Sequence, residues 1–110
     1  MTHRFHTYDA ALAMVAALRP VLAQLAKGDR ALTDQIRRAT SSVALNIAEG
    51  NRRTGQDRLQ FFRIAAGSAA EVRAALEVAS AWGRIEASPR AEAELDRVLA
   101  MLWRLTHGRG

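Results

Sequence analysis

Apolar residues recur along the chain at spacings of three, four and seven positions, the spacing that places side chains on one face of an α-helix. Four segments show this pattern, at about residues 8–26, 29–52, 54–82 and 88–106. No segment shows the alternation of apolar and polar residues that is typical of a half-buried strand. The pattern therefore predicts an all-α chain of four helices.

Each predicted helix carries one apolar stripe that we expect to form the core. The four stripes, in chain order, are Tyr8, Val15, Leu18, Leu22 and Leu25; Leu32, Ile36, Ala39, Val43, Ile47 and Gly50; Phe62, Ala65, Ala69, Val72, Leu76 and Ala79; and Leu95, Val98, Leu99, Leu102 and Leu105. Pro20 lies inside the first helix, and we expect it to kink or loosen that helix because proline lacks a backbone N–H.

The three breaks between the segments contain residues that are typical of helix ends. Asp29 follows a Gly and is placed to cap the second helix. Thr54 is placed to cap the third helix, with Asp57 three residues later returning the bond in a capping box. Ser88 is placed to cap the fourth helix, with Pro89 at its first position. Because the links are short, we expect an up-down-up-down antiparallel four-helix bundle in a single domain, residues 1–110.

Some apolar residues lie away from the predicted core. Leu45 points opposite the core face of its helix, and the third helix carries a second stripe that consists of Ile64, Ala75, Val78 and Trp82. Extra apolar faces indicate self-association, although single exposed apolar residues are also normal on monomers.

Arginine dominates the charge of the chain. Of sixteen basic residues only Lys27 is a lysine, and eleven acidic residues leave a net charge of +5. Residues 30–63 contain a net +4 of this charge. Guanidinium groups suit bidentate contact with phosphate, and the turn at residues 51–56 adds donors at a helix N-terminus. The candidate nucleic-acid-binding residues are Arg37, Arg38, Arg52, Arg53, Arg58 and Arg63. The alternatives are a solvated surface with salt bridges and an arginine content set by coding bias.

Two short lines of polar residues lie at helical spacing on the second and third helices. Ser42, Asn46 and Glu49 fall at i, i+4 and i+7, and Ser68 and Glu71 at i and i+3. If the two edges meet, these groups pair with a facing serine, arginine or backbone end and specify the helix register. We interpret the five residues as a structural polar network rather than a reaction centre.

The sequence offers few metal ligands. It contains no cysteine, which excludes disulfides, thiolate zinc sites and cysteine nucleophiles. A di-iron bundle uses Glu-x-x-His pairs, and neither Glu49 nor Glu71 has a histidine at that spacing. The three histidines, His3, His6 and His107, lie near the ends of the sequence and could form at most an adventitious surface site. We therefore expect no metal and no cofactor.

The sequence likewise predicts no catalytic residue. Arg104 and His107, like Arg4 and His6, lie too close in sequence for the Arg–His pair of some four-helix ribonucleases. No other group is marked as an activated acid or base. We expect no enzyme activity.

No membrane contact is expected either. The apolar run at residues 10–18 ends at Arg19 and Pro20, and no stretch approaches the roughly 18 to 20 apolar residues that span a bilayer. The run is typical of a core helix, and the cytoplasm is the expected location.

Two motifs on consecutive helices resemble the 23S rRNA intervening-sequence proteins. They are SVALNIAEG at residues 42–50, followed by Arg53, and FFRIAAGS at residues 61–68, followed by Glu71; residues 35–39 also match. At position 66 this chain has Ala where the family commonly has Arg. The resemblance implies a four-helix bundle assembled as a homopentamer, without enzyme activity. A related branch is similar to the accessory proteins of diversity-generating retroelements, which bind a reverse transcriptase and nucleic acid.

These observations predict a non-enzymatic, oligomeric four-helix bundle that binds RNA or DNA through an arginine-rich surface. The alternative is a protein–protein interaction scaffold that has no nucleic-acid ligand, in which the arginines serve solubility and salt bridges.

Overall fold

The computed structural model describes residues 3–108, and their side chains from His6 onward. It contains four helices, α1 (His3–Ala26), α2 (Arg30–Asn51), α3 (Gly55–Ala81) and α4 (Pro89–His107), and no strand within those residues. The prediction of an all-α chain with four helices is confirmed. The main difference in bounds is that α1 begins at His3 rather than near residue 8.

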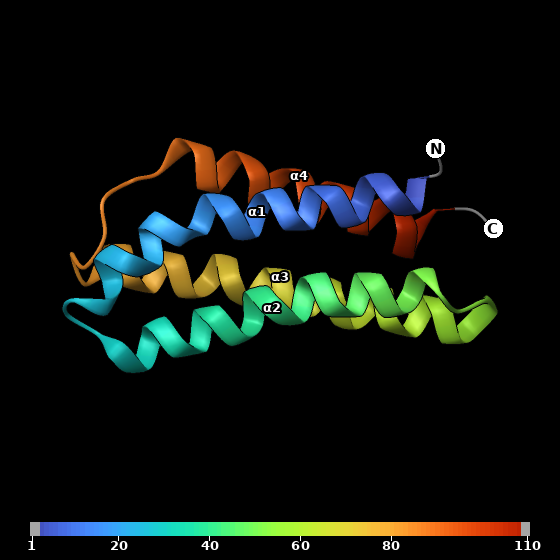
Figure 1. Cartoon of the computed structure of the whole chain (residues 1–110), viewed down its shortest axis with the longest axis horizontal. Coiled ribbons are helices and arrows are strands. Elements are labelled where there is room, and N and C mark those ends of the chain that lie inside the picture. Colours follow the sequence, from blue (N-terminus) through green and yellow to red (C-terminus); the bar gives the residue numbers. More distant parts are fainter. Residues whose placement is uncertain (1–2, 109–110) are drawn as a thin grey trace.

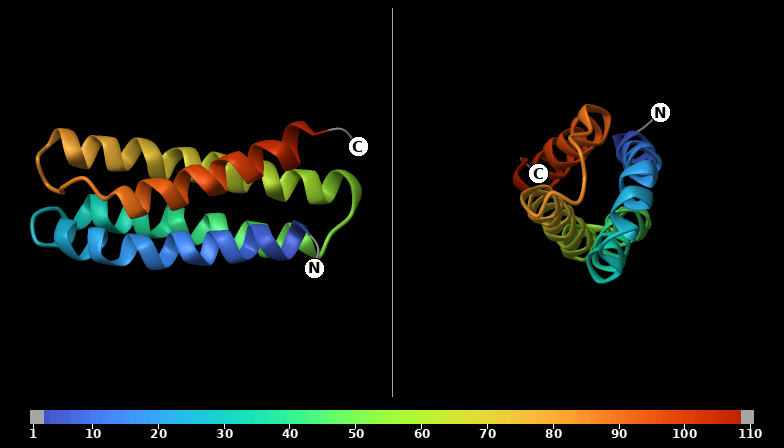
Figure 2. Two further views of the ribbon diagram at one scale, coloured as in Figure 1. Left: turned by 90° about the horizontal axis from the view of Figure 1, so that it is seen from above. Right: turned by 90° about the vertical axis from the view of Figure 1, so that its left-hand side faces the viewer.

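The helices lie side by side along an elongated body of 43 × 22 × 18 Å. In Figure 1 the chain reverses direction along the long axis at each link, so α1 begins and α4 ends beside the turn between α2 and α3. Viewed end-on in Figure 2, α1 lies next to α2 and α4, and α3 lies next to α2 and α4. The contact between α2 and α3 is the most extensive of the four.

Side-chain caps begin α2 and α4 as the sequence predicted. The Asp29 carboxylate accepts a hydrogen bond from the Leu32 N–H at 2.9 Å. The Ser88 hydroxyl accepts one from the Ala91 N–H at 3.3 Å, with Pro89 at the first position of α4. Each cap satisfies a backbone donor that has no partner inside the helix, so these two helix starts are fixed locally.

The core contains apolar side chains from all four helices, and its largest members include Phe62, Met14, Leu18 and Ile36. The predicted stripes of α2, α3 and α4 lie in the core or partly buried against it. Ala75, predicted to lie away from the core on a second stripe of the third helix, is also buried in it.

The predicted stripe of α1 is partly wrong: Tyr8 and Leu22 pack against the core, but the half-buried Val15 does not. The positions buried instead are Ala10, Ala11, Met14, Ala17 and Val21. Because α1 packs against both α2 and α4, its small alanines are buried on a wider arc than the stripe of large residues indicates.

Gly50 allows α2 and α3 to approach closely. A Cβ atom at this position would lie 2.6 Å from Cε1 of the Phe62 ring, which is buried. The aromatic ring therefore occupies the space beside the α2 backbone where another residue would place its side chain. This contact anchors the end of α2 to the start of α3, next to the arginine-rich turn.

One expectation about α1 needs correction. The segment His6–Ala26 has a mean hydropathy of 1.4 and is long and apolar enough, by length and composition, to cross a membrane. The expectation that no stretch reaches this length is wrong, because the alanines and leucines around Arg19 and Pro20 keep the mean hydropathy of the segment high. In the bundle, one face of this segment lies in the core, with Met14, Leu18 and Leu25 fully buried.

Candidate nucleic-acid interface

A polar joint connects α2 and α3 near their middle. The hydroxyl oxygens of Ser42 and Ser68 lie 2.8 Å apart, so one donates a hydrogen bond to the other. The Asn46 amide donates to the Ser42 carbonyl oxygen at 2.8 Å and to its hydroxyl oxygen at 3.0 Å. All three residues are partly buried, so these bonds replace water and tie the two helices at one register.

The two carboxylates of the predicted polar network point elsewhere. Glu71 is exposed and accepts a long hydrogen bond of 3.5 Å from the Gln35 amide. Glu49 faces the turn that follows α2 and accepts from Nε of Arg53 at 3.0 Å. The five residues therefore form three separate contacts rather than one continuous network. The Gln35 contact was not predicted, because it depends on how α2 and α3 are aligned.

Arg53 is held by two carboxylates and an aromatic ring. Besides its bond to Glu49, it donates through Nη1 to the Asp57 carboxylate at 3.0 Å. Its guanidinium carbon lies 5.0 Å from the centroid of the Phe61 ring. The hydrogen bonds to Glu49 and to Asp57 raise the pKa of the Arg53 guanidinium above its usual value. Arg53 is thus a permanent cation that braces the turn between α2 and α3.

The capping box predicted for α3 is wrong. The Thr54 side chain makes no capping hydrogen bond, and the Asp57 carboxylate pairs with Arg53 instead of returning to residue 54. Gly55 begins the helix with φ +62°, a conformation that favours glycine. An arginine donates two strong, charge-assisted bonds to carboxylates, so it competes successfully for the group that the box requires.

The other candidate arginines differ in how far they are engaged. Arg37 pairs with Asp34 at 2.8 Å, and the Arg58 guanidinium lies 5.2 Å from the centroid of the Phe62 ring. The Arg52 side chain is 78% exposed, and its nearest Glu49 oxygen lies 3.8 Å away. Within residues 6–108, Arg38 and Arg63 are exposed and form no ion pair. The most available cations are therefore Arg38, Arg52 and Arg63.

The six arginines do not share one face. Arg37 lines a shallow groove between α1 and α2 together with Arg19 and Leu22. Arg58 lines a different groove, together with Arg104 and Leu105 of α4. By contrast, Arg38 and Arg52 each lie seven residues from Leu45, which is 67% exposed. Because Arg52, the C-cap residue of α2, keeps a helical backbone conformation, the three form one row along the outside of α2 and its cap. We call this set the α2 row.

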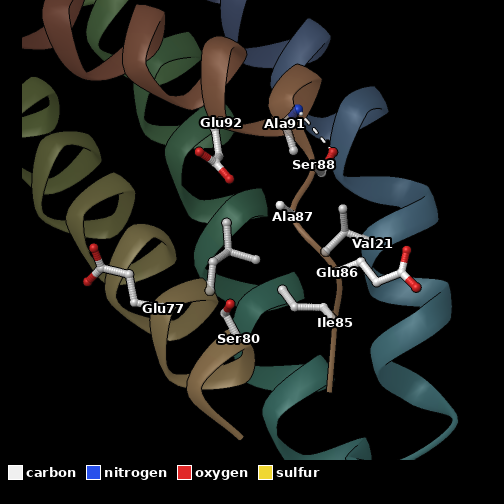
Figure 3. Close-up of a pocket in the computed structure, with 10 residues that line it drawn as sticks. Val21, Glu77, Ser80, Ile85, Glu86, Ala87, Ser88, Ala91 and Glu92 are labelled. Carbon is white, nitrogen blue, oxygen red and sulfur yellow. Dashed lines mark hydrogen bonds between the residues drawn. The ribbon is translucent and has the colours of Figure 1, made fainter. Parts of the chain in front are cut away.

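A small pocket lies at the other end of the bundle. Figure 3 shows apolar side chains such as Val21 and Ile85 in its wall, with the carboxylates of Glu77, Glu86 and Glu92 around them. Its volume is about 110 Å³, and no histidine lines it. The Ser88 hydroxyl in its wall caps α4 and is not poised beside a base. The pocket offers an acidic, partly apolar concavity rather than an anion site.

The described histidines, His6 and His107, give no metal-binding geometry. Among the described side chains, no group of three or more His, Asp or Glu residues could hold a metal ion. His6 and His107 are exposed, and the side chains of His3 and Arg4, which the sequence raised as candidates, lie outside the described residues.

Comparison with known proteins identifies one family. The family described as 23S rRNA-intervening sequence protein matches residues 4–104 of this chain. The match includes all four helices except the first residue and the last turn. A search of curated proteins found no match.

Proposed function

The chain belongs to the 23S rRNA-intervening sequence protein family, and we propose that it is a non-enzymatic, oligomeric four-helix bundle that binds RNA or DNA through exposed arginines. The α2 row carries this proposal. Arg38 lies on the outer face of α2 and Arg52 at its C-cap, about 20 Å apart along the helix axis at 1.5 Å per residue. Both lie in the segment that contains +4 of the net charge of +5. Exposed guanidinium groups on one helical face suit the phosphates of a nucleic-acid backbone.

We propose that the subunits assemble as a homopentamer, which the family resemblance implies. Four exposed apolar side chains support self-association: Leu45 (67% exposed), Ile64 (41%), Val78 (47%) and Trp82 (72%). Assembly would repeat the α2 row in every subunit, and repeated weak phosphate contacts add to a larger overall affinity. We propose that the protein acts in the cytoplasm and needs no membrane, metal or cofactor. A further partner would be a protein such as a reverse transcriptase.

The proposal is tested by removing the two arginines of the α2 row. We expect the double variant Arg38→Ala/Arg52→Ala to bind a fluorescently labelled oligonucleotide more weakly than the wild type. The slope of log K against log salt should fall in magnitude by about 0.7 to 0.9 for each phosphate that no longer pairs with an arginine. The measurement is fluorescence anisotropy at several salt concentrations, with circular dichroism to verify that both exposed substitutions leave the helices intact.

Arg84→Ala is the matched control, because Arg84 is an exposed arginine in the link at the other end of the bundle. It removes a positive charge without touching the α2 row, and its salt slope should equal that of the wild type. An equal loss of affinity per removed charge in Arg84→Ala and in the double variant would assign binding to net charge and reject the α2 row.

The alternative function is a protein-interaction scaffold. The exposed apolar residues favour it, since such residues suit a polypeptide surface better than a phosphate backbone. Failure of the wild-type protein to bind any oligonucleotide at low salt would reject the nucleic-acid function and favour the scaffold.

A further inference from the structure

Trp103 presents an ordered aromatic surface on α4 that the sequence pattern did not indicate. Its side chain is 60% exposed, although tryptophan is usually mostly covered. The imidazole of His107, one helical turn further on, lies parallel to it, with ring centroids 4.5 Å apart and an interplanar angle of 7°. The two rings therefore form a stack on the outside of the bundle.

The histidine ring is held in place by hydrogen bonds. Its Nδ1 lies 3.1 Å from the Trp103 carbonyl oxygen and 3.0 Å from the Thr106 hydroxyl oxygen. Because a carbonyl oxygen only accepts, the bond to Trp103 requires the hydrogen on Nδ1. The Thr106 hydroxyl in turn donates to the Leu102 carbonyl oxygen at 2.8 Å. The stack is thus organised before any ligand arrives, which lowers the entropy cost of binding.

Positive charge flanks this stack. Residues 97–107 contain two arginines and no acidic residue. Arg97 and Arg104 lie seven residues apart on one side of α4, about 10 Å along its axis at 1.5 Å per residue. Arg97 has Glu94 at 3.7 Å, whereas Arg104 is exposed and forms no ion pair within the described residues. The nearest upstream acid, Asp96, pairs with Arg73 on α3.

We propose that Trp103 and His107 form a platform on which an unpaired base of single-stranded RNA or DNA stacks, with Arg104 contacting the neighbouring phosphate. The inference rests on the proposed nucleic-acid function and specifies its ligand. An exposed aromatic ring beside cations binds single strands because every base has a π-face, whereas the bases of a duplex are already stacked on one another. The platform lies on α4, apart from the α2 row.

The two tryptophans of the chain allow a direct test, since Trp82 and Trp103 are the only indoles. In Trp82→Phe the fluorescence arises from Trp103 alone, and we expect oligo(dT) and oligo(rU) to quench it as a base stacks on the ring. In Trp103→Phe the fluorescence arises from Trp82 at the end of α3, and the same oligonucleotides should leave it unchanged. Comparison of the two oligonucleotides distinguishes DNA from RNA as the preferred source of the base.

Affinity provides the second measurement. Trp103→Ala should weaken anisotropy-detected binding of oligo(dT) by roughly 5- to 150-fold, the range for loss of one base–aromatic stack. It should leave the weaker binding of a duplex unchanged. Because the Trp103 side chain is exposed, circular dichroism should show an intact fold. Leu12→Ala, at an exposed leucine on α1 that belongs to neither the platform nor the proposed subunit contacts, serves as the control with no effect on affinity.

The outcomes separate the platform from the general function. If the wild type binds oligo(dT) but Trp103 is not quenched and Trp103→Ala retains full affinity, the platform is rejected and the arginine-based function stands. If the wild type binds no oligonucleotide of either kind, both are rejected. Quenching of Trp103 together with selective loss of single-strand affinity supports the platform.

Discussion

Several side chains in this bundle make contacts other than those that their sequence motif predicts. Ser42, Asn46 and Glu49 lie on one edge of α2, yet only the serine and the amide belong to the joint with α3, while the carboxylate neutralises the following turn. Arg53, a candidate phosphate ligand by sequence, is bound to two carboxylates and 43% exposed. We therefore expect Arg53 to act mainly on the conformation of the turn.

The joint between the helices predicts a measurable coupling. Ser42→Ala should lower the free energy of unfolding by about 1 to 3 kcal/mol, because the Ser42 hydroxyl bonds to both Ser68 and Asn46 and each hydrogen bond has a usual net value of about 0.5 to 1.5 kcal/mol. A double-mutant cycle with Ser68→Ala, measured by urea unfolding, should give a coupling energy of at least about 0.5 kcal/mol. Additive effects of the two single substitutions would mean that the hydroxyl pair does not stabilise the bundle.

At the scale of the helix, the contact between α2 and α3 is organised by a glycine and a ring. The buried Phe62 fills the space beside Gly50, and the same pair of helices carries the Ser42–Ser68 bond further along. Gly67 on α3 is different, because a Cβ atom there would meet nothing within 4 Å. The two glycines have the same helical propensity but opposite surroundings. Substituting each by alanine therefore distinguishes the effect of packing on stability from the effect of helical propensity.

We expect Gly50→Ala to destabilise the protein and Gly67→Ala to stabilise it. In a helix interior, alanine stabilises the folded state by roughly 0.5 to 1 kcal/mol relative to glycine. At Gly50 the added methyl group displaces the Phe62 ring, and overpacking costs about 1 to 3 kcal/mol, which exceeds the gain. Urea unfolding of the two variants checks this. Equal stabilisation by both substitutions would show that the ring moves aside without cost.

At the scale of the whole molecule, exposed arginines and exposed apolar side chains lie together on the outside of an elongated bundle. The α2 row places an exposed Leu45 between two arginines, and Ile64, Val78 and Trp82 remain exposed along α3. A bundle of this size needs no such surface for its own core, because the core is complete with side chains from all four helices. The exposed residues are therefore the best candidates for contact between subunits.

Leu45→Glu is predicted to shift the protein from oligomer to monomer without unfolding it. The side chain is 67% exposed in the single chain, so the charge is solvated there but would be costly in an apolar subunit interface. Native mass spectrometry should report the five-subunit mass for the wild type and a smaller mass for the variant. Leu12→Glu, at a leucine on α1 that is 45% exposed, is the control and should retain the wild-type mass. A wild type that is monomeric at low salt would reject the proposed assembly.

Sequence alone was sufficient to predict the four helices, most of the core positions of α2, α3 and α4, and the caps at Asp29 and Ser88. These features are local: helical periodicity and a side chain that reaches its own first turn need no knowledge of the partner helix. The buried face of α1 emerged only from packing, because alanines on several sides carry little information about direction. The pairing of Ser42 with Ser68 and of Gln35 with Glu71 also required the folded chain, because helix alignment governs both contacts. Two further contacts join residues at helical spacing: Arg53 bonds to Glu49 and Asp57, and the ring of Trp103 stacks on that of His107. The spacing permits these contacts but also permits other partners and rotamers, and only the folded structure decides among them.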